Sequence, residues 1–194
     1  MSVRPDRLII PFASQDDWEA WLAEQHATSA GLWIKIAKKD SGIASVDYEQ
    51  AVEGALCYVW IDGQKDKFDD KYWLQQFTPR RPKSKWSKIN CGKVAELIEK
   101  GRMRPPGLRQ VEEAKADGRW DAAYPGARTI TVPDDLQREL DKNDVAREFF
   151  STLDRTNRYA ILYRLHNATK PEARARRIEK FVAMLSEHQK LVQT

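Results

Sequence analysis

Cysteine, histidine and long apolar runs are all scarce in this chain of 194 residues. Its two cysteines, Cys57 and Cys91, and its three histidines lie far apart without C-x-x-C or H-x-x-x-H spacing, so the sequence predicts no metal site. We expect no secretory leader from the pattern of the first residues, and two cysteines are then more typical of reduced thiols than of a disulfide framework. No stretch reaches the roughly 18 apolar residues that a membrane-spanning helix needs. We therefore expect a cytoplasmic protein that does not insert into membranes.

Glycine-rich phosphate loops are absent as well. Neither G-x-G-x-x-G nor G-x-x-x-x-G-K-[ST] occurs, so no nucleotide cofactor is predicted. Cys57 lies in the apolar "ALCYVWI", which favours a buried and inert thiol, whereas Lys88 and Lys93 would lower the pKa of Cys91 if that thiol were exposed. We assign no catalytic residue and no cofactor. Enzyme activity is left open, and a binding protein is favoured.

Charge is abundant and unevenly distributed. The net charge is only +4, but residues 1–77 carry −5, residues 78–109 carry +8, residues 110–154 carry −5 and residues 155–194 carry +6. Seven tryptophans supply large side chains for a core, and a charged fraction of 32% with both signs present argues against a disordered chain. The sequence therefore predicts a folded protein with two basic segments, and it leaves open whether these segments share a face.

Residues 1–124 mix strand and helix patterns. "RLIIPF" and "LWIKIAKK" have the composition and alternation of strands. Ser14 and Asp47 are placed as N-caps of two amphipathic helices. "YVWIDGQKDKF" predicts a strand, an Asp-Gly turn and a second strand, and "KYWLQQFTP" predicts a further strand that ends at Pro79. We therefore predict an α+β fold, with a small mostly antiparallel sheet backed by helices.

Residues 134–194 show helical patterns alone, after the boundary segment "YPGARTITVP". Asn143 is placed to cap one helix, and Thr169 with Glu172 forms a T-x-x-E capping box for the last helix. We predict that this C-terminal helical region packs as an appendage on the α+β domain of residues 1–124.

The most informative stretch is "TPRRPKSKWSKINCGK" at residues 78–93, which holds six Lys or Arg and no acid. We expect Ser84 to cap a helix, so that guanidinium groups and helix N–H groups face one anion. Trp86 is placed either to stack on a base or to anchor this helix in the core. A solvated basic surface with Trp86 buried is the alternative. The candidate ligand-binding residues here are Arg80, Arg81, Lys83, Ser84, Lys85, Trp86 and Lys88.

Two further groups of residues are weaker candidates. Trp60 and Asp62 stand in the predicted hairpin, where they could form a small-molecule or enzyme site with Trp86. Clustered acids in the same hairpin are more typical of solvated turns. Arg174 and Arg177 form a second basic patch in "KPEARARRIEK", although neighbouring glutamates can pair with them.

Several long motifs resemble one bacterial protein family. "ALCYVWIDGQKDKFDDKYWLQQFTPRRPKSKWSKIN", "LIEKGRMRPPGLRQVEEAKADGRW" and "NRYAILYRLHNATKPEARARRI" follow the order found in the YdeI/OmpD-associated, or bacteriocin-protection, proteins. The resemblance spans nearly the whole chain and extends, more distantly, to the YjbR/CyaY-like group. It implies an antiparallel sheet backed by helices, in agreement with the pattern of elements. Two positions depart from the family: Val59 replaces the usual Gly of "GWID", and Ala173 replaces the Thr of "ETR".

The residues and the resemblance together predict a non-enzymatic binding protein. Nucleic acid is the expected ligand, held by phosphate neutralisation and base stacking with weak sequence selectivity and steep salt dependence. The resemblance implies a role in bacteriocin or antimicrobial-peptide stress. Two alternatives stay open: a small phosphate- or carboxylate-bearing molecule around Trp60, Asp62 and Trp86, and a protein partner. The sequence does not give the oligomeric state.

Overall fold

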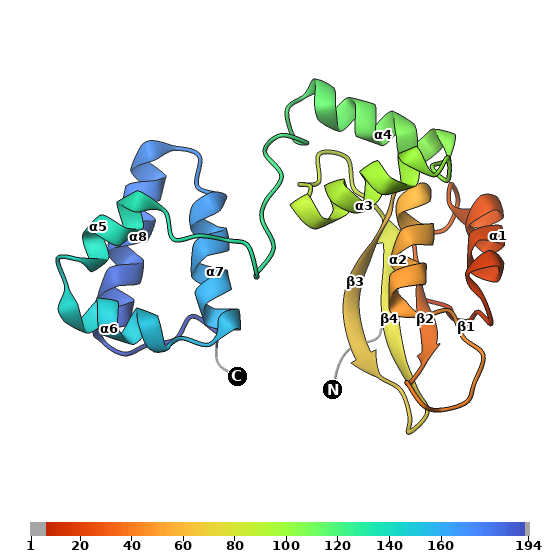
Figure 1. The fold of residues 1–194 in the computed structure, drawn as a ribbon, viewed down its shortest axis with the longest axis horizontal. Helices are drawn as coiled ribbons and strands as arrows, with labels where there is room; N and C mark the ends of the chain where they lie inside the picture. Colours follow the sequence, from red (N-terminus) through yellow and green to blue (C-terminus); the bar gives the residue numbers. More distant parts are fainter. Residues whose placement is uncertain (1–6, 193–194) are drawn as a thin grey trace. The chain divides into compact units, whose positions relative to one another are not determined.

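The computed structural model divides the chain into two compact units, residues 1–123 (unit 1) and 124–194 (unit 2), and describes residues 7–192 (Figure 1). Within the described residues, unit 1 holds a four-stranded sheet and four helices, and unit 2 holds four helices. The predicted α+β class is confirmed, with a small mostly antiparallel sheet and a helical C-terminal region.

The sheet of unit 1 has the strand order β1-β2-β4-β3. Its strands are β1 (Ile9–Pro11), β2 (Leu32–Ala37), β3 (Trp60–Lys67) and β4 (Tyr72–Pro79). Strand β1 runs parallel to β2, and the other two pairings are antiparallel. The parallel pair is possible because helix α1 (Gln15–Gln25) carries the chain back between the two strands.

Successive side chains of β2 point alternately to the two faces of the sheet. Leu32, Ile34 and Ile36 belong to the core beneath the helices, as the sequence predicts. Trp33 on the opposite face is also almost completely buried, with 1% of its surface exposed. The Lys35 ammonium on that face lies over two aromatic rings of the β3–β4 hairpin, 4.5 and 4.0 Å from their centroids.

The β3–β4 hairpin differs from the predicted one. Strand β3 continues through Asp62 and Gly63, where the register of the pairing shifts, and the chain turns instead at residues 68–71. The turn forms there because the Asp69 carboxylate accepts hydrogen bonds from two backbone N–H groups, at 2.8 and 2.7 Å. The Asp-Gly pair therefore occupies an irregularity within the strand, a place that glycine also favours.

Four helices pack with the sheet around one core. Helices α1 and α2 (Tyr48–Cys57) lie along the sheet, and α3 (Lys88–Glu99) and α4 (Pro105–Ala116) lie at one end of it (Figure 1). Ser14 and Asp47 cap α1 and α2 as predicted, since each side chain accepts a hydrogen bond from a first-turn N–H group. The shared core includes Trp18, Leu22, Val52, Leu56, Phe77, Val94, Leu97 and Val111.

Unit 2 is a bundle in which α8 packs against the other three helices. Its helices are α5 (Asp134–Leu140), α6 (Asp144–Thr152), α7 (Arg155–His166) and α8 (Pro171–Ser186). Asn143 caps α6 as predicted. The predicted T-x-x-E capping box is wrong, because α8 begins at Pro171 and Lys170 takes the N-cap position without a side-chain hydrogen bond. Thr169 therefore stands one residue too early to cap this helix.

Candidate functional site

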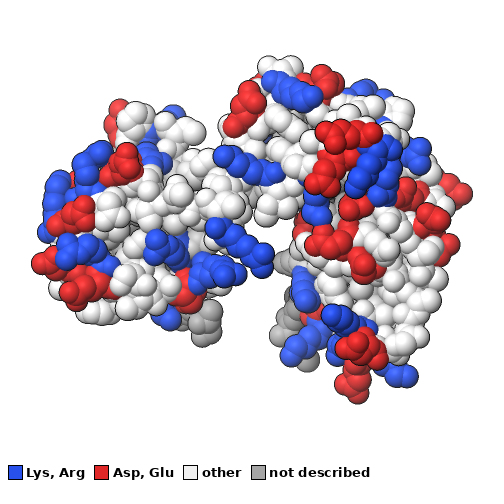
Figure 2. All heavy atoms as spheres, viewed as in Figure 1, with Lys and Arg blue, Asp and Glu red and all other residues white. Residues whose placement is uncertain are grey.

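Charged side chains of both signs are interspersed on the surface of each unit (Figure 2). Within residues 7–192, no group of His, Cys, Asp and Glu is arranged to hold a metal ion. No helix in this range is long and apolar enough to cross a membrane. The segment between β4 and α3 together with the first residue of α3, which we call the basic loop (residues 80–88), differs from the mixed surface because it contains no acidic residue.

The basic loop begins with a tight turn. The Ser84 N–H donates to the Arg81 carbonyl over 3.1 Å, with Pro82 and Lys83 in the two central positions. Lys83 has a φ of 63°. Proline followed by a residue of positive φ is the pattern of a type II turn, in which glycine usually takes the second position. The turn leaves Lys83 exposed at the tip of the loop.

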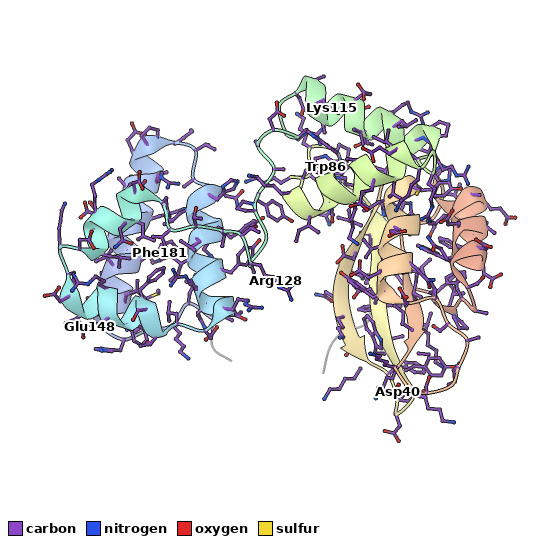
Figure 3. The ribbon with its side chains drawn as sticks, in the orientation of Figure 1. Asp40, Trp86, Lys115, Arg128, Glu148 and Phe181 are labelled. Atoms are coloured by element: carbon purple, nitrogen blue, oxygen red, sulfur yellow. The ribbon has the colours of Figure 1, made fainter. Side chains whose placement is uncertain are left out.

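Arg80 and Trp86 lie in the interior beneath the basic loop, with only 8% and 3% of their surfaces exposed. The Arg80 guanidinium stacks 3.9 Å from the centroid of the Trp86 ring and donates a hydrogen bond to the Lys85 carbonyl. Trp86, labelled in Figure 3, packs against Trp120 at 5.0 Å. Trp86 therefore anchors the loop in the core, which is one of the two placements that the sequence leaves open, and its ring is not exposed for stacking on a base. Arg80, also predicted to bind the ligand, fixes the loop from inside.

Ser87, and not the predicted Ser84, caps helix α3. Its hydroxyl accepts a hydrogen bond from the Asn90 N–H at 3.1 Å. The helix begins late because the segment before it is not helical and carries Trp86 into the core. The Ser84 carbonyl instead accepts a hydrogen bond from Arg119 at 3.3 Å. This second support of the loop comes from the segment after α4, and no local sequence signal indicates it.

Four cations of the basic loop are exposed: Arg81, Lys83, Lys85 and Lys88. In the part of the chain that the structure describes, Arg81, Lys83 and Lys88 take part in no ion pair. The first turn of α3 contains no acid, so its free backbone N–H groups add partial positive charge to the same surface. Four of the predicted site residues are thus brought together as a solvent-facing cationic group.

The thiols are not poised for nucleophilic chemistry. Cys91 is partly buried on α3, and burial raises the pKa of its thiol to about 11, an effect that the charge of Arg80 only partly offsets. The condition for a reactive Cys91, exposure beside Lys88 and Lys93, is therefore not met. Cys57 is completely buried, as predicted, and burial is the main cause that raises the pKa of its thiol to about 11 as well.

Trp60, Asp62 and Trp86, which the sequence suggests as a small-molecule site, each have partners within unit 1. Trp60 is 1% exposed, and its indole N–H donates to the His26 carbonyl at 3.2 Å. Asp62 accepts a hydrogen bond from the Tyr48 hydroxyl at 2.8 Å. Burial, and next to it this hydrogen bond, raises the pKa of Tyr48. The three residues therefore have different direct partners, although Arg80, which stacks on Trp86, lines the same hollow as Trp60, and the common site stays a prediction.

Trp60 also lines a hollow of about 220 Å³ at the ends of α2 and β4. Its other walls include His26, Tyr58 and Arg109, which supply an imidazole, a phenol and a guanidinium group. Val59 forms part of the wall with a φ of 69°, a conformation that β-branched residues rarely adopt. This is the position where the resembled family has glycine, which adopts such a φ freely.

Arg174 and Arg177, the second basic patch predicted from the sequence, make hydrogen bonds within unit 2. Arg174 donates hydrogen bonds to both carboxylate oxygens of Asp135, at 2.5 and 2.9 Å, and to the Leu165 carbonyl at 2.5 Å. Arg177 donates to the Arg164 carbonyl at 2.8 Å. Both guanidinium groups therefore join helices of the bundle, and the suggestion that they also bind a ligand stays a prediction.

Two protein-family models match the chain. A domain of unknown function, DUF8412, matches residues 10–110, more than half of the chain, and the family described as bacteriocin-protection, YdeI or OmpD-associated, matches residues 129–188. No curated protein and no solved structure matches. The resemblance drawn from "NRYAILYRLHNATKPEARARRI" is thus confirmed, whereas the likeness to the YjbR/CyaY-like group stays a prediction. The chain belongs to the family of the domain of unknown function DUF8412, and its C-terminal unit carries a bacteriocin-protection, YdeI or OmpD-associated domain.

Proposed function

We propose that unit 1 is a non-enzymatic binding module that holds the phosphate backbone of nucleic acid on its basic loop. The observation that carries this proposal is the group of four exposed cations, Arg81, Lys83, Lys85 and Lys88, in a segment without acids. Guanidinium, ammonium and helix N–H groups are the donors that bind phosphate in proteins.

The interior contacts of the loop support the same proposal. Arg80 stacks on Trp86 and binds the Lys85 carbonyl, while Arg119 binds the Ser84 carbonyl. These contacts hold the loop backbone in place before any ligand arrives. A preorganised binding segment loses less conformational entropy on association than a flexible one, so more of the electrostatic attraction appears as affinity.

The buried position of Trp86 sets the expected selectivity of this surface. With its ring in the core, the basic loop offers cations to phosphate and no aromatic ring to a base. Phosphate contacts carry no sequence information, so the loop should bind single strands and duplexes of any sequence. With four cations engaged, log K for a duplex should fall by about 3 to 4 for each unit of log salt concentration.

A charge-matched pair of variants tests this proposal. The first changes the four exposed cations of the basic loop to alanine. The second removes the same amount of charge from unit 2 by changing four exposed residues to alanine: Arg138, Lys142, Arg147 and Lys180. Both are titrated against a fluorescein-labelled DNA duplex by anisotropy, between about 50 and 200 mM salt.

We expect the loop variant to bind the duplex at least about tenfold more weakly and to lose most of the salt dependence. The unit 2 variant should bind almost as tightly as the wild type. Equal affinities for wild type and loop variant at low salt would overturn the proposal. Equal losses of affinity in both variants would also overturn it, because binding would then depend on net charge and not on the basic loop.

The cellular setting is part of the proposal. The scarcity of cysteine and the lack of long apolar runs support a cytoplasmic location. The description of the family that matches residues 129–188 supports a role in protection against bacteriocins or other antimicrobial peptides. Bacteria that lack the protein should then survive such peptides less well than cells that carry it.

A small anionic ligand is the second candidate, supported by the hollow beside Val59. Its wall holds an unusual backbone conformation and the exposed Arg109, which has no ion pair among residues 7–192. Calorimetric titration with phosphate and with simple carboxylates tests it. This candidate requires that Arg109→Ala abolishes small-anion binding while the loop variant retains it.

A further inference from the structure

The outward side of α7 in unit 2 carries a row of tyrosines. Tyr159 and Tyr163 are one helical turn apart, with ring centroids 5.7 Å from each other. Tyr124 packs edge-on against Tyr163 at 4.9 Å, and the Tyr159 hydroxyl donates to the Pro125 carbonyl at 3.3 Å. All three rings are partly exposed. We call these three residues the tyrosine platform.

The bundle does not use the tyrosine platform as its core. The buried residues of α7 are Asn157, Ile161, Leu162 and Leu165. Asn157, Ile161 and Leu165 lie on the side of the helix away from the tyrosines, and Leu162 lies between the two sides. The hydrophobic cluster found among the described residues of unit 2 is built from aliphatic side chains, alanine and phenylalanine, and contains none of the three tyrosines. The three rings therefore lie at the surface of the bundle, where they pack against one another and against the segment of Tyr124 and Pro125.

Cations surround the tyrosine platform. Helix α7 contains no acidic residue, and its exposed Arg155 and Arg164 stand before Tyr159 and after Tyr163. Arg128, labelled in Figure 3, is exposed on the segment that also holds Tyr124. Figure 2 shows Lys and Arg side chains gathered beside α7 on the viewed face, and residues 155–194 carry a net charge of +6.

Partly exposed aromatic rings between arginines are the features that bind single-stranded nucleic acid. The faces of the bases are open only in a single strand, where they stack on tyrosine while the phosphates pair with cations. A duplex hides these faces in its own stack. We propose that the tyrosine platform binds single-stranded nucleic acid by base stacking, with Arg128, Arg155 and Arg164 contacting the phosphates. This site belongs to unit 2 and does not depend on the basic loop of unit 1.

Two double variants of the full chain test this inference. Tyr159→Leu with Tyr163→Leu removes both rings and keeps apolar bulk, whereas Tyr159→Phe with Tyr163→Phe keeps the rings. Each is titrated by anisotropy with labelled oligo-dT and with a labelled duplex, after circular dichroism has shown that the helical content is retained. The leucine variant should bind oligo-dT roughly tenfold or more weakly, with an unchanged salt slope, because stacking and not charge is lost. Its duplex affinity should not change.

The phenylalanine variant should keep the single-strand affinity. If it loses as much as the leucine variant, or if the leucine variant binds oligo-dT like the wild type, the inference is wrong. Photo-crosslinking with 5-iodouracil in the oligonucleotide gives a second measurement, in which Tyr159 or Tyr163 should be labelled. Labels confined to residues 81–88 would contradict the platform while supporting the basic loop.

The same titrations separate this inference from the function proposed for unit 1. The basic-loop variant should weaken single-strand and duplex binding alike, whereas the leucine variant should weaken single-strand binding alone. If the leucine variant loses affinity for single strands while the loop variant binds like the wild type, the inference about the tyrosine platform is supported and the function proposed for unit 1 is wrong.

Discussion

At the scale of single residues, Val59 holds a backbone conformation that its side chain disfavours. With a φ of 69° it lies in the left-handed region, where a β-branched side chain crowds the backbone. Its N–H donates to the Leu56 carbonyl at 3.3 Å, and its own carbonyl accepts from the Arg80 N–H at 2.8 Å. The surrounding hydrogen bonds therefore impose a strain of about 1–2 kcal/mol on this residue.

Val59→Gly should raise the melting temperature of unit 1, because glycine adopts a positive φ without steric cost. A net gain of about 1 kcal/mol would raise Tm by about 3–5 °C in a unit of the size of residues 1–123. Tryptophan fluorescence measures it, since all seven tryptophans lie in residues 1–123. Val59→Ala keeps a Cβ and should gain less; an equal gain in both variants would argue against backbone strain as the cause.

The basic loop shows how far single residues can be predicted from the sequence. Its charge is visible in the printed letters, and so the exposed Arg81, Lys83 and Lys85 could be named as candidates. Arg80 differs from Arg81 only by burial against Trp86, which depends on Trp120 far along the chain. A local pattern contains no information on such a contact. For this reason the same ligand-binding role is predicted for Arg80 and Arg81.

At the scale of helices and strands, Asp135 and Arg174 join α5 to α8. The hydrogen bonds from Arg174 are the main cause that holds the pKa of the Asp135 carboxyl below its ordinary value. A carboxyl whose pKa is lower in the folded than in the unfolded state stabilises the fold above its unfolded pKa of about 4. That stabilisation is lost as the pH falls through the folded pKa.

Asp135→Asn should therefore destabilise unit 2 at neutral pH and have little effect in acid. Loss of the charged hydrogen bonds should lower the free energy of unfolding by about 1–2 kcal/mol near pH 7. Urea unfolding followed by far-UV circular dichroism measures it across a pH series, in which wild type and variant should converge as Asp135 becomes protonated. Asp144→Asn, at an exposed ion pair with Arg147, is the control and should change stability by less than about 0.5 kcal/mol. A difference that persists in strong acid would contradict the role of the Asp135 charge.

The residue at which each helix starts depends in some cases on local sequence and in others on packing. The caps Ser14, Asp47 and Asn143 were predictable, because each side chain bonds an N–H group three residues ahead. The starts of α3 and α8 were misplaced, since burial of Trp86 delays the first and Pro171 fixes the second. The β3–β4 turn was misplaced for a similar reason, because an Asp-Gly pair suits a bulge as well as a turn.

At the scale of the whole molecule, the two units have separate hydrophobic clusters. The cluster of unit 1 is rich in tryptophan, whereas that of unit 2 is built from aliphatic side chains, alanine and phenylalanine. The segment "YPGARTITVP", from which the sequence predicts a boundary, begins at residue 124, the first residue of unit 2. The tyrosine platform was not visible in the sequence, because its three rings come from segments that are far apart along the chain, and only the fold brings them together.

The separate clusters lead to a prediction about unfolding. Phe181 is 4% exposed in the cluster of unit 2, and Phe181→Ala should lower the stability of that unit by about 3–5 kcal/mol. In urea, circular dichroism should then show an early loss of helix, while the tryptophan fluorescence of unit 1 keeps its wild-type midpoint. Leu97→Ala, in the cluster of unit 1, is the reciprocal variant and should move the fluorescence midpoint. If Phe181→Ala moves the fluorescence midpoint as far as the circular dichroism midpoint, the two units unfold as one cooperative structure.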